Sequence, residues 1–245
     1  RRLAGMTNAG QDLTGGSIRA DPRHSKKGFW MDKTTKVPRK LSREARREQL
    51  IEATIAVLAV RGYARATLTE VADTAGLSHG LVNFHFTSKD SLFSETLAYL
   101  SEEYTQNWQR ELAKAGPHPA ARLDAFLRAD FLPEICTPQR LAAWCAFWGE
   151  AQSRPLYQEK CGSKNADYIE KLEQICDALI ADGGYRGKPD RIARAIRVAS
   201  EGIWIDLVTQ PDGYSSDEAL QTVLACCAAF FPKHFDAEGQ LKDLS

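Results

Sequence analysis

A short stretch from Ser78 to His85 carries residues that hydrophobic packing does not explain. Val82 and Phe86 lie four residues apart, so they would share the inward face of one helix. The residues that face elsewhere are His79, Gly80, Asn83 and Phe84. An asparagine presented on a helix can form two hydrogen bonds with the edge of adenine in the major groove of DNA. The stretch therefore indicates chemistry that reads bases.

Two short helices joined by a tight turn would position these side chains. Thr67 and Glu70 form a capping-box pair at the start of the first helix. Gly76 suits a left-handed helix stop, because glycine has no Cβ to clash there. Ser78 can cap the second helix, which we expect to run to His85. This is the helix-turn-helix pattern, whose second helix enters the major groove.

The same stretch also matches a motif of a different chemistry. Gly76, Ser78 and Gly80 fit G-x-S-x-G, the nucleophile elbow of serine hydrolases. That elbow needs a buried strand before it, whereas residues 70–75 show a helical period and no strand-like run. A hydrolase that uses Ser78 stays an alternative, as does an all-helical binding protein with an incidental helix-turn-helix.

The range from Gly62 to Phe93 resembles the DNA-binding domain of TetR-type repressors. The matching residues are Gly62, Tyr63, Thr67, Val71, Ala72, Ala75, Gly76, Ser78, Gly80, His85, Phe86, Ser88, Lys89, Asp90 and Leu92. One departure is Asn83–Phe84, where the family usually has an aromatic pair. Because asparagine reads adenine well, this departure changes the operator sequence that we expect.

The resemblance also implies which residues contact DNA. Lys89 matches a lysine that grips a phosphate, and His85 matches another phosphate-contacting position. Arg46 lies early in the helix predicted over 42–61, where it either contacts the DNA backbone or is solvated. The predicted DNA contacts are Arg46, Thr67, Thr69, Ser78, His79, Gly80, Asn83, Phe84, His85 and Lys89.

Charge is distributed unevenly along this chain of zero net charge. Residues 1–50 hold 13 basic and 5 acidic residues, and the remainder holds 19 basic and 27 acidic residues. A basic front and an acidic back suit a DNA-binding head on a regulatory body, although a solvated charged tail would look the same. Residues 1–41 lack periodicity, so we predict a disordered basic leader and expect the native chain to start at Met31.

The rest of the chain is predicted to be helical, and the fold class is therefore all-α. Beyond the helix-turn-helix, helices are expected over 89–114, 120–132, 138–152, 155–181, 189–210 and 216–231. We place the DNA-binding domain at 42–95, an effector-binding and dimerisation domain at 96–232, and a C-terminal tail at 233–245. No apolar run is long enough to span a membrane, so we expect a cytoplasmic protein.

An aromatic stripe suggests a site for a cation. Trp144, Phe147, Trp148 and Ala151 recur at helical spacing and would share one face. Indole faces attract quaternary ammonium groups. Tyr104, Trp108 and Trp204 are candidates for further walls, and Glu150 and Asp206 for a compensating negative charge. An ordinary hydrophobic core would show the same stripe, so both interpretations stay open.

The second half resembles the choline-responsive repressors of glycine-betaine synthesis, a branch of the same family. The resemblance lies in residues 143–148, 155–157 and 201–204. It implies a homodimer formed through the helices 189–210 and 216–231. It also implies a double-stranded operator and a small effector, choline or a related quaternary ammonium compound. The same switch with a different hydrophobic effector stays open.

The remaining reactive residues give no catalytic, metal or cofactor site in the sequence. The six cysteines contain no C-x-x-C pair and lie at no zinc-ligand spacing from a histidine. The five histidines are His24, His79, His85, His118 and His234, and they form no visible cluster. We therefore expect a regulator without a cofactor or a metal ion and without enzymatic activity.

Overall fold

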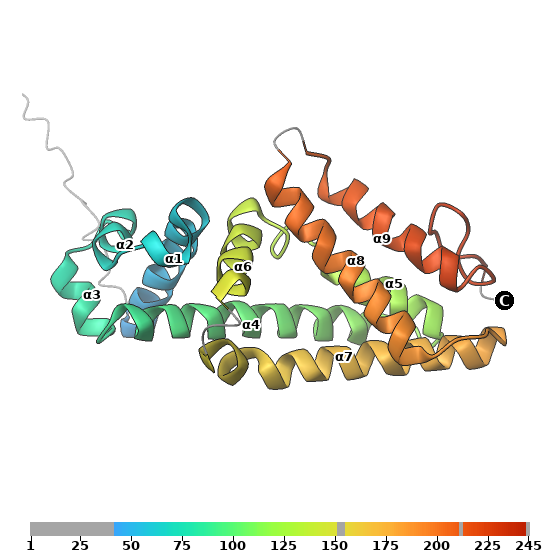
Figure 1. Cartoon of the computed structure of the whole chain (residues 1–245). Coiled ribbons are helices and arrows are strands. Elements are labelled where there is room, and N and C mark those ends of the chain that lie inside the picture. The colour runs from blue at the N-terminus through green and yellow to red at the C-terminus, as the bar shows by residue number, and fades with distance from the viewer. Residues whose placement is uncertain (1–41, 151–154, 211–212, 244–245) are drawn as a thin grey trace, which may run out of the picture. The chain divides into compact units, whose positions relative to one another are not determined.

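The computed structural model describes residues 42–150, 155–210 and 213–243, and of residues 156 and 157 only the backbone. Within these residues the chain is helical apart from its connections and one isolated bridge between Phe235 and Leu241 (Figure 1). The predicted all-α class is confirmed. The predicted leader over 1–41, the start at Met31 and the position of Ala151 fall outside the described residues.

The described helices follow one another with short connections. They are α1 (Arg43–Arg65), α2 (Leu68–Ala75), α3 (His79–His85), α4 (Lys89–Lys114), α5 (Pro119–Ala129), α6 (Pro138–Glu150), α7 (Pro155–Gly183), α8 (Pro189–Thr209) and α9 (Ser216–Phe230). None of them is long and apolar enough to cross a membrane.

The turn between α2 and α3 forms as its residues dictate. The hydroxyl of Thr67 accepts the N–H of Glu70 at 3.2 Å, and the carboxylate of Glu70 accepts the N–H of Thr67, so the capping box is present. Gly76 ends α2 in the left-handed region with φ 67°. Ser78 then caps α3 by accepting the N–H of Leu81. The three predicted signals are confirmed.

Helix α1 positions this unit against α4. Its N-terminus is capped by Ser42, and its buried face carries Leu50, Ile55 and Leu58. Gly62 interrupts the helix with φ 70°, at the position where the sequence predicted its end, and one further turn follows. The core between α1, α2, α3 and α4 is completed by Val71, Ala72, Val82, Phe86, Leu92 and Phe93.

The long helix α4 packs on α1 near its start and on α5 and α7 further along (Figure 1). Helix α6 lies against α1 on one side and α8 on the other, and α8 runs beside α9. Single helices therefore belong to both the helix-turn-helix region and the later part. We therefore expect a movement of α4 or α6 to displace residues in both of these regions.

Two segments differ from the predicted boundaries in ways that matter for the site. Helix α5 ends at Ala129, three residues before the predicted end, because the chain tightens there: the N–H of Asp130 donates to Leu127 O at 3.1 Å. Pro133 also disfavours helical backbone in the residue before it. The predicted tail after 232 folds back as far as residue 243, with His234 and Phe235 buried.

Candidate DNA-reading helix and effector cavity

One face of α3 is turned to solvent. Val82 and Phe86 are buried, whereas His79, Gly80, Asn83 and Phe84 are exposed. Phe84 is 69% exposed, which is unusual for a large apolar residue. The amide Nδ2 of Asn83 lies 3.1 Å from Nδ1 of His79, one turn earlier on the same face. The face thus presents an amide, an imidazole and an aromatic ring together.

Arginines of α1 border this face. The guanidinium of Arg43 lies 5.9 Å from the ring centre of Phe84. Arg46 donates to the side-chain oxygen of Gln49 at 2.7 Å. Arg47 donates to the backbone oxygen of His85 at 2.8 Å and pairs with Glu95, so it fixes α1 to the end of α3 and to α4.

The two residues that were predicted to contact a DNA phosphate are Lys89 and His85. Lys89, at the first position of α4, donates to the backbone oxygens of Tyr63 at 3.1 Å and Ala64 at 3.3 Å, so a phosphate would have to replace them. His85 is buried, and its Nδ1 has no hydrogen-bond partner among the described residues. Burial, followed by the charges of nearby arginines, lowers the pKa of His85, so its imidazole is neutral at physiological pH.

The remaining DNA candidates lie at the starts of α2 and α3. Thr69 is exposed on α2, Thr67 holds the cap of α2, and Ser78 holds the cap of α3. Because Ser78 follows a helix and begins another, its surroundings lack the strand that a nucleophile elbow requires.

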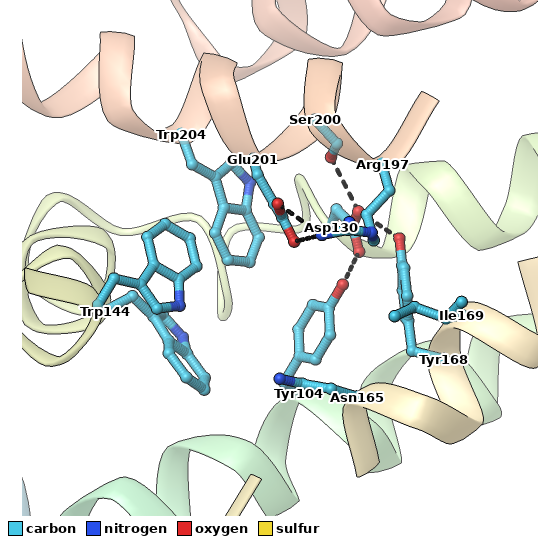
Figure 2. Close-up of a pocket in the computed structure, with 11 residues that line it drawn as sticks. Tyr104, Asp130, Trp144, Asn165, Tyr168, Ile169, Arg197, Ser200, Glu201 and Trp204 are labelled. Carbon is cyan, nitrogen blue, oxygen red and sulfur yellow. Dashed lines mark hydrogen bonds and ion pairs between the residues drawn. The ribbon is translucent and has the colours of Figure 1, made fainter. Parts of the chain in front are cut away.

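The second site is a cavity lined by residues of α4, α6, α7 and α8 and by Asp130 (Figure 2). Its volume is about 610 Å³, counted with its opening to solvent. The lining residues are Tyr104, Asp130, Trp144, Trp148, Asn165, Tyr168, Ile169, Arg197, Ser200, Glu201 and Trp204. The cavity therefore combines an aromatic part with a polar part.

The aromatic part consists of three indoles and one phenol. The ring centre of Trp148 lies 6.1 Å from that of Trp144 and 6.2 Å from that of Trp204. The rings of Trp148 and Trp204 are stacked, with 15° between their planes. Tyr104 meets Trp204 edge-on at 5.7 Å. The indole Nε1 of Trp204 is buried and has no hydrogen-bond partner among the described residues.

The polar part is centred on the buried carboxylate of Asp130. Figure 2 shows three hydroxyl groups converging on it, and these donate at 2.8 Å from Tyr104, 3.0 Å from Tyr168 and 2.9 Å from Ser200. Burial raises the pKa of Asp130 to about 6, and the three hydrogen bonds offset only part of this. Among the described residues, no basic side chain forms an ion pair with Asp130.

The nearby guanidinium is already neutralised. Arg197 donates to both oxygens of Glu201, one turn further along α8, at 2.6 and 2.8 Å. Glu201 in turn contributes to the raised pKa of Asp130 through its negative charge. The charge of Asp130 is therefore the one that the lining residues leave without a counterion in the described structure.

The structure brings four of the six predicted effector contacts together: Tyr104, Trp144, Trp148 and Trp204 line the cavity. Trp108 instead packs on Phe126 and Tyr168. Phe147 turns toward Tyr63 of α1, with ring centres 5.8 Å apart. Neither of the two lines the cavity.

The predicted acidic partners also lie elsewhere. Asp206 accepts the hydroxyl of Tyr214 at 2.8 Å and does not line the cavity, nor does Glu150. Two carboxylates line the cavity, Glu201 paired with Arg197 and Asp130 without a counterion among the described residues, and neither was predicted from the sequence. One signal could have found Asp130, because it is an isolated acid between the apolar residues Ala129 and Phe131.

Comparison with known proteins shows which family has this architecture. Residues 50–96 match the family model described as "Bacterial regulatory proteins, tetR family", and residues 119–232 match "BetI-type transcriptional repressor, C-terminal". The HTH-type transcriptional regulator BetI of Paraburkholderia xenovorans is 30% identical over 196 residues, which cover 70% of this chain and 97% of that protein. The chain belongs to the TetR family.

Solved structures of similar regulators agree with this assignment. A putative transcriptional regulator from Pseudomonas aeruginosa PAO1 is 26% identical with a TM-score of 0.67, over 83% of this chain and 97% of that one. A putative regulator from Saccharomonospora viridis, solved in complex with choline, shares the fold at 19% identity and a TM-score of 0.64, over 74% and 94% of the two chains.

Family membership settles the coarse function. This TetR-family chain, with its BetI-type C-terminal domain, is a transcriptional repressor and not an enzyme, so the hydrolase interpretation of Ser78 is wrong. TetR regulators bind DNA operators and small effectors.

The exposed amide of Asn83 leads to a prediction about DNA recognition. Replacing Asn83 with alanine should weaken operator binding by about 1–3 kcal/mol and relax the preference at one base pair, because the amide is the group predicted to read a base edge. Competition binding against single-base operator variants measures both effects. Thr74→Ala, at an exposed position of α2 outside the predicted contacts, is the control. An unchanged base preference in Asn83→Ala would rule out base reading by this residue.

The raised pKa of Asp130 leads to a prediction about stability. The carboxyl holds its proton more tightly in the folded chain, with a pKa of about 6 against an ordinary value of 3.8. Its contribution to the free energy of unfolding should therefore fall by about 3 kcal/mol as the pH rises through this interval. Urea unfolding at one protein concentration and several pH values, for the wild type and Asp130→Asn, measures it. A difference between the two that does not change with pH would contradict the raised pKa.

Proposed function

We propose that this protein is a dimeric repressor that leaves its operator when a small quaternary ammonium compound, choline being the first candidate, binds the cavity. The observation that carries the proposal is the buried carboxylate of Asp130, which has no counterion among the described residues. A buried ion without a partner is unfavourable. A cationic ligand in the cavity would supply the missing charge.

The hydrogen bonds around Asp130 favour a cation without N–H groups. A carboxylate offers about four lone-pair sites, and three hydroxyl groups already donate to it. A primary ammonium ion would bring three donors into a site with few acceptors left for them. A methylated nitrogen needs only the negative charge and an apolar surface.

The indoles supply that apolar surface. Trp144, Trp148 and Trp204 are adjacent, and each cation–π contact with an indole face contributes about 0.5–2 kcal/mol when it is desolvated. The negative charge and the aromatic faces match the chemistry of choline. The similarity to BetI and to the choline-bound Saccharomonospora regulator supports the same candidate.

Helix α6 offers a route from the cavity to the DNA-binding region. Arg140 lies one turn before Trp144 on α6 and is 16% exposed. It donates to Glu103 of α4 through two bonds of 2.7 and 2.8 Å, and to Glu52 of α1 at 2.9 Å. A ligand that displaces the indoles would shift this three-helix junction.

A pair of chains is needed for a palindromic operator, and we assign the dimer contact to α8 and α9. Val198, Ile205 and Val208 are exposed apolar residues on α8, which suits burial against a second copy. The two recognition helices must then lie about 34–36 Å apart. Effector binding would favour dimers with a different spacing and so shift the population away from DNA.

The proposal is tested by fluorescence anisotropy with DNA from upstream of the protein's own gene, at fixed salt. Choline should weaken DNA binding of the wild type by about 5- to 150-fold, as expected for a coupling of 1–3 kcal/mol. Asp130→Asn should lose this response, since the neutral amide no longer attracts the cation. Asp206→Asn, which alters an acid outside the cavity, should keep it.

The outcomes separate the two candidate effector classes. DNA binding that ignores choline would overturn the choline assignment and favour a different hydrophobic effector. An unchanged choline response in Asp130→Asn would show that this carboxylate does not hold the cation. The affinity of each variant for DNA without choline reports whether it is folded.

The junction at Arg140 yields a separate prediction. Arg140→Met should leave the choline affinity of the free protein within about 3-fold, but reduce the choline effect on DNA affinity by about 0.5–2 kcal/mol. Calorimetry measures the first quantity and anisotropy the second. Arg110→Met, which removes an arginine from an exposed ion pair on α4, is the control. Full coupling in Arg140→Met would exclude this route.

A further inference from the structure

Three residues that are far apart in the sequence meet at the N-terminal end of α5, the end opposite Asp130. They are His118 before α5, Asp182 near the end of α7, and His234 in the segment after α9. Their ligand atoms all lie within 4.8 Å of one another. Nε2 of His234 lies 2.6 Å from a carboxylate oxygen of Asp182, and Nε2 of His118 lies 3.7 Å from the same oxygen.

Both imidazoles are oriented through their other nitrogen. His118 is the N-cap of α5, and its Nδ1 accepts the N–H of Ala120 at 3.2 Å. Nδ1 of His234 lies 2.9 Å from the hydroxyl of Tyr185, which accepts the N–H of Lys233. A metal-binding histidine typically donates a hydrogen bond from the ring nitrogen away from the metal ion, and the hydroxyl oxygen of Tyr185 is placed to accept such a bond from His234. The bond at Nδ1 of His118 runs the other way, because this nitrogen accepts the N–H of Ala120.

We propose that His118, Asp182 and His234 form a binding site for a divalent transition-metal ion such as Zn²⁺. Two imidazoles and one carboxylate are suitable ligands, and a water would take the fourth position. Bonds of about 2.0–2.1 Å in a tetrahedron place neighbouring ligand atoms about 3.3 Å apart. The observed 2.6 and 3.7 Å lie on either side of this value, so small side-chain movements complete the site. Asp182 is 46% exposed, which gives an ion access.

Binding changes the proton positions in a defined way. The metal ion takes Nε2 of each imidazole, so each ring carries its proton on Nδ1. The Nδ1–H of His234 then donates to the oxygen of Tyr185. His118 gives up the capping bond from Ala120, and the N-terminus of α5 is held by the metal ion instead. The ammonium of Lys233 donates to the backbone oxygen of Gly183 and keeps this hydrogen bond when the metal ion binds.

The site connects to the cavity through α5. His118 is the N-cap of this helix and Asp130 is its C-cap. An ion at one end would tie α5 to α7 and to the C-terminal segment, and so change how easily the carboxylate at the other end adjusts to a ligand. This second step rests on the proposed function, whereas metal binding itself does not.

The experiment is calorimetric titration of the full-length protein with Zn²⁺ under reducing conditions. We expect one ion per chain. His118→Ala and Asp182→Asn should weaken binding by more than about 100-fold, beyond the 10–100-fold typical of losing an outer partner. Both variants leave the buried His234 and its contact with Tyr185 in place, and circular dichroism checks their folding. His79→Ala, which removes an exposed imidazole outside the cluster, should bind as the wild type does.

The ligand type is read from the Co²⁺ form. Its absorption should show no thiolate charge-transfer band, because the proposed ligands are nitrogen and oxygen. A thiolate band, wild-type affinity in both ligand variants, or no stoichiometric binding would overturn the site. These outcomes are independent of choline: specific Zn²⁺ binding supports the site even where choline leaves DNA binding unchanged, and its absence overturns the site even where choline releases DNA.

Discussion

The buried carboxylate of Asp130 is the constraint around which the effector domain is arranged. Hydroxyl groups from α4, α7 and α8 converge on the residue that ends α5, so four helices meet at one negative charge. Burying this charge lowers stability at neutral pH, as its raised pKa indicates. A site that sacrifices stability in this way is characteristic of a binding function. In the proposed function, the adjacent indoles select which cation this charge receives.

Besides α4, two helices connect this centre to the rest of the molecule. Helix α6 carries cavity indoles on one part of its length and Arg140 on another, where the guanidinium joins α1 and α4. Helix α5 runs from the His118 cluster to Asp130. The proposed effector, the DNA-binding region and the proposed metal ion would therefore act on shared helices. Coupling then requires only that these helices have two arrangements with different affinities for each ligand.

The sequence allowed the helix-turn-helix to be predicted almost residue by residue, because its signals are local: Thr67, Gly76 and Ser78 act within one turn of themselves. The indoles of α6 could also be predicted from their spacing. The orientation of Phe147 and the role of Asp130 could not, since both depend on packing between helices distant in sequence. The approach of His118 to His234 has no sequence signal at all, because the two come together only through tertiary structure.

The most direct test of the central claim is the affinity of the free protein for choline and for its neutral carbon analogue, in which a tert-butyl group replaces the trimethylammonium group. The two ligands have nearly the same shape and differ in charge, so calorimetry with both isolates the effect of Asp130. If the carboxylate provides the binding energy, choline should bind at least about tenfold more tightly, a difference of about 1.4 kcal/mol. Equal affinity for the two ligands would mean that the cavity selects an apolar shape, and the account of Asp130 as the counterion of a cationic effector would be wrong.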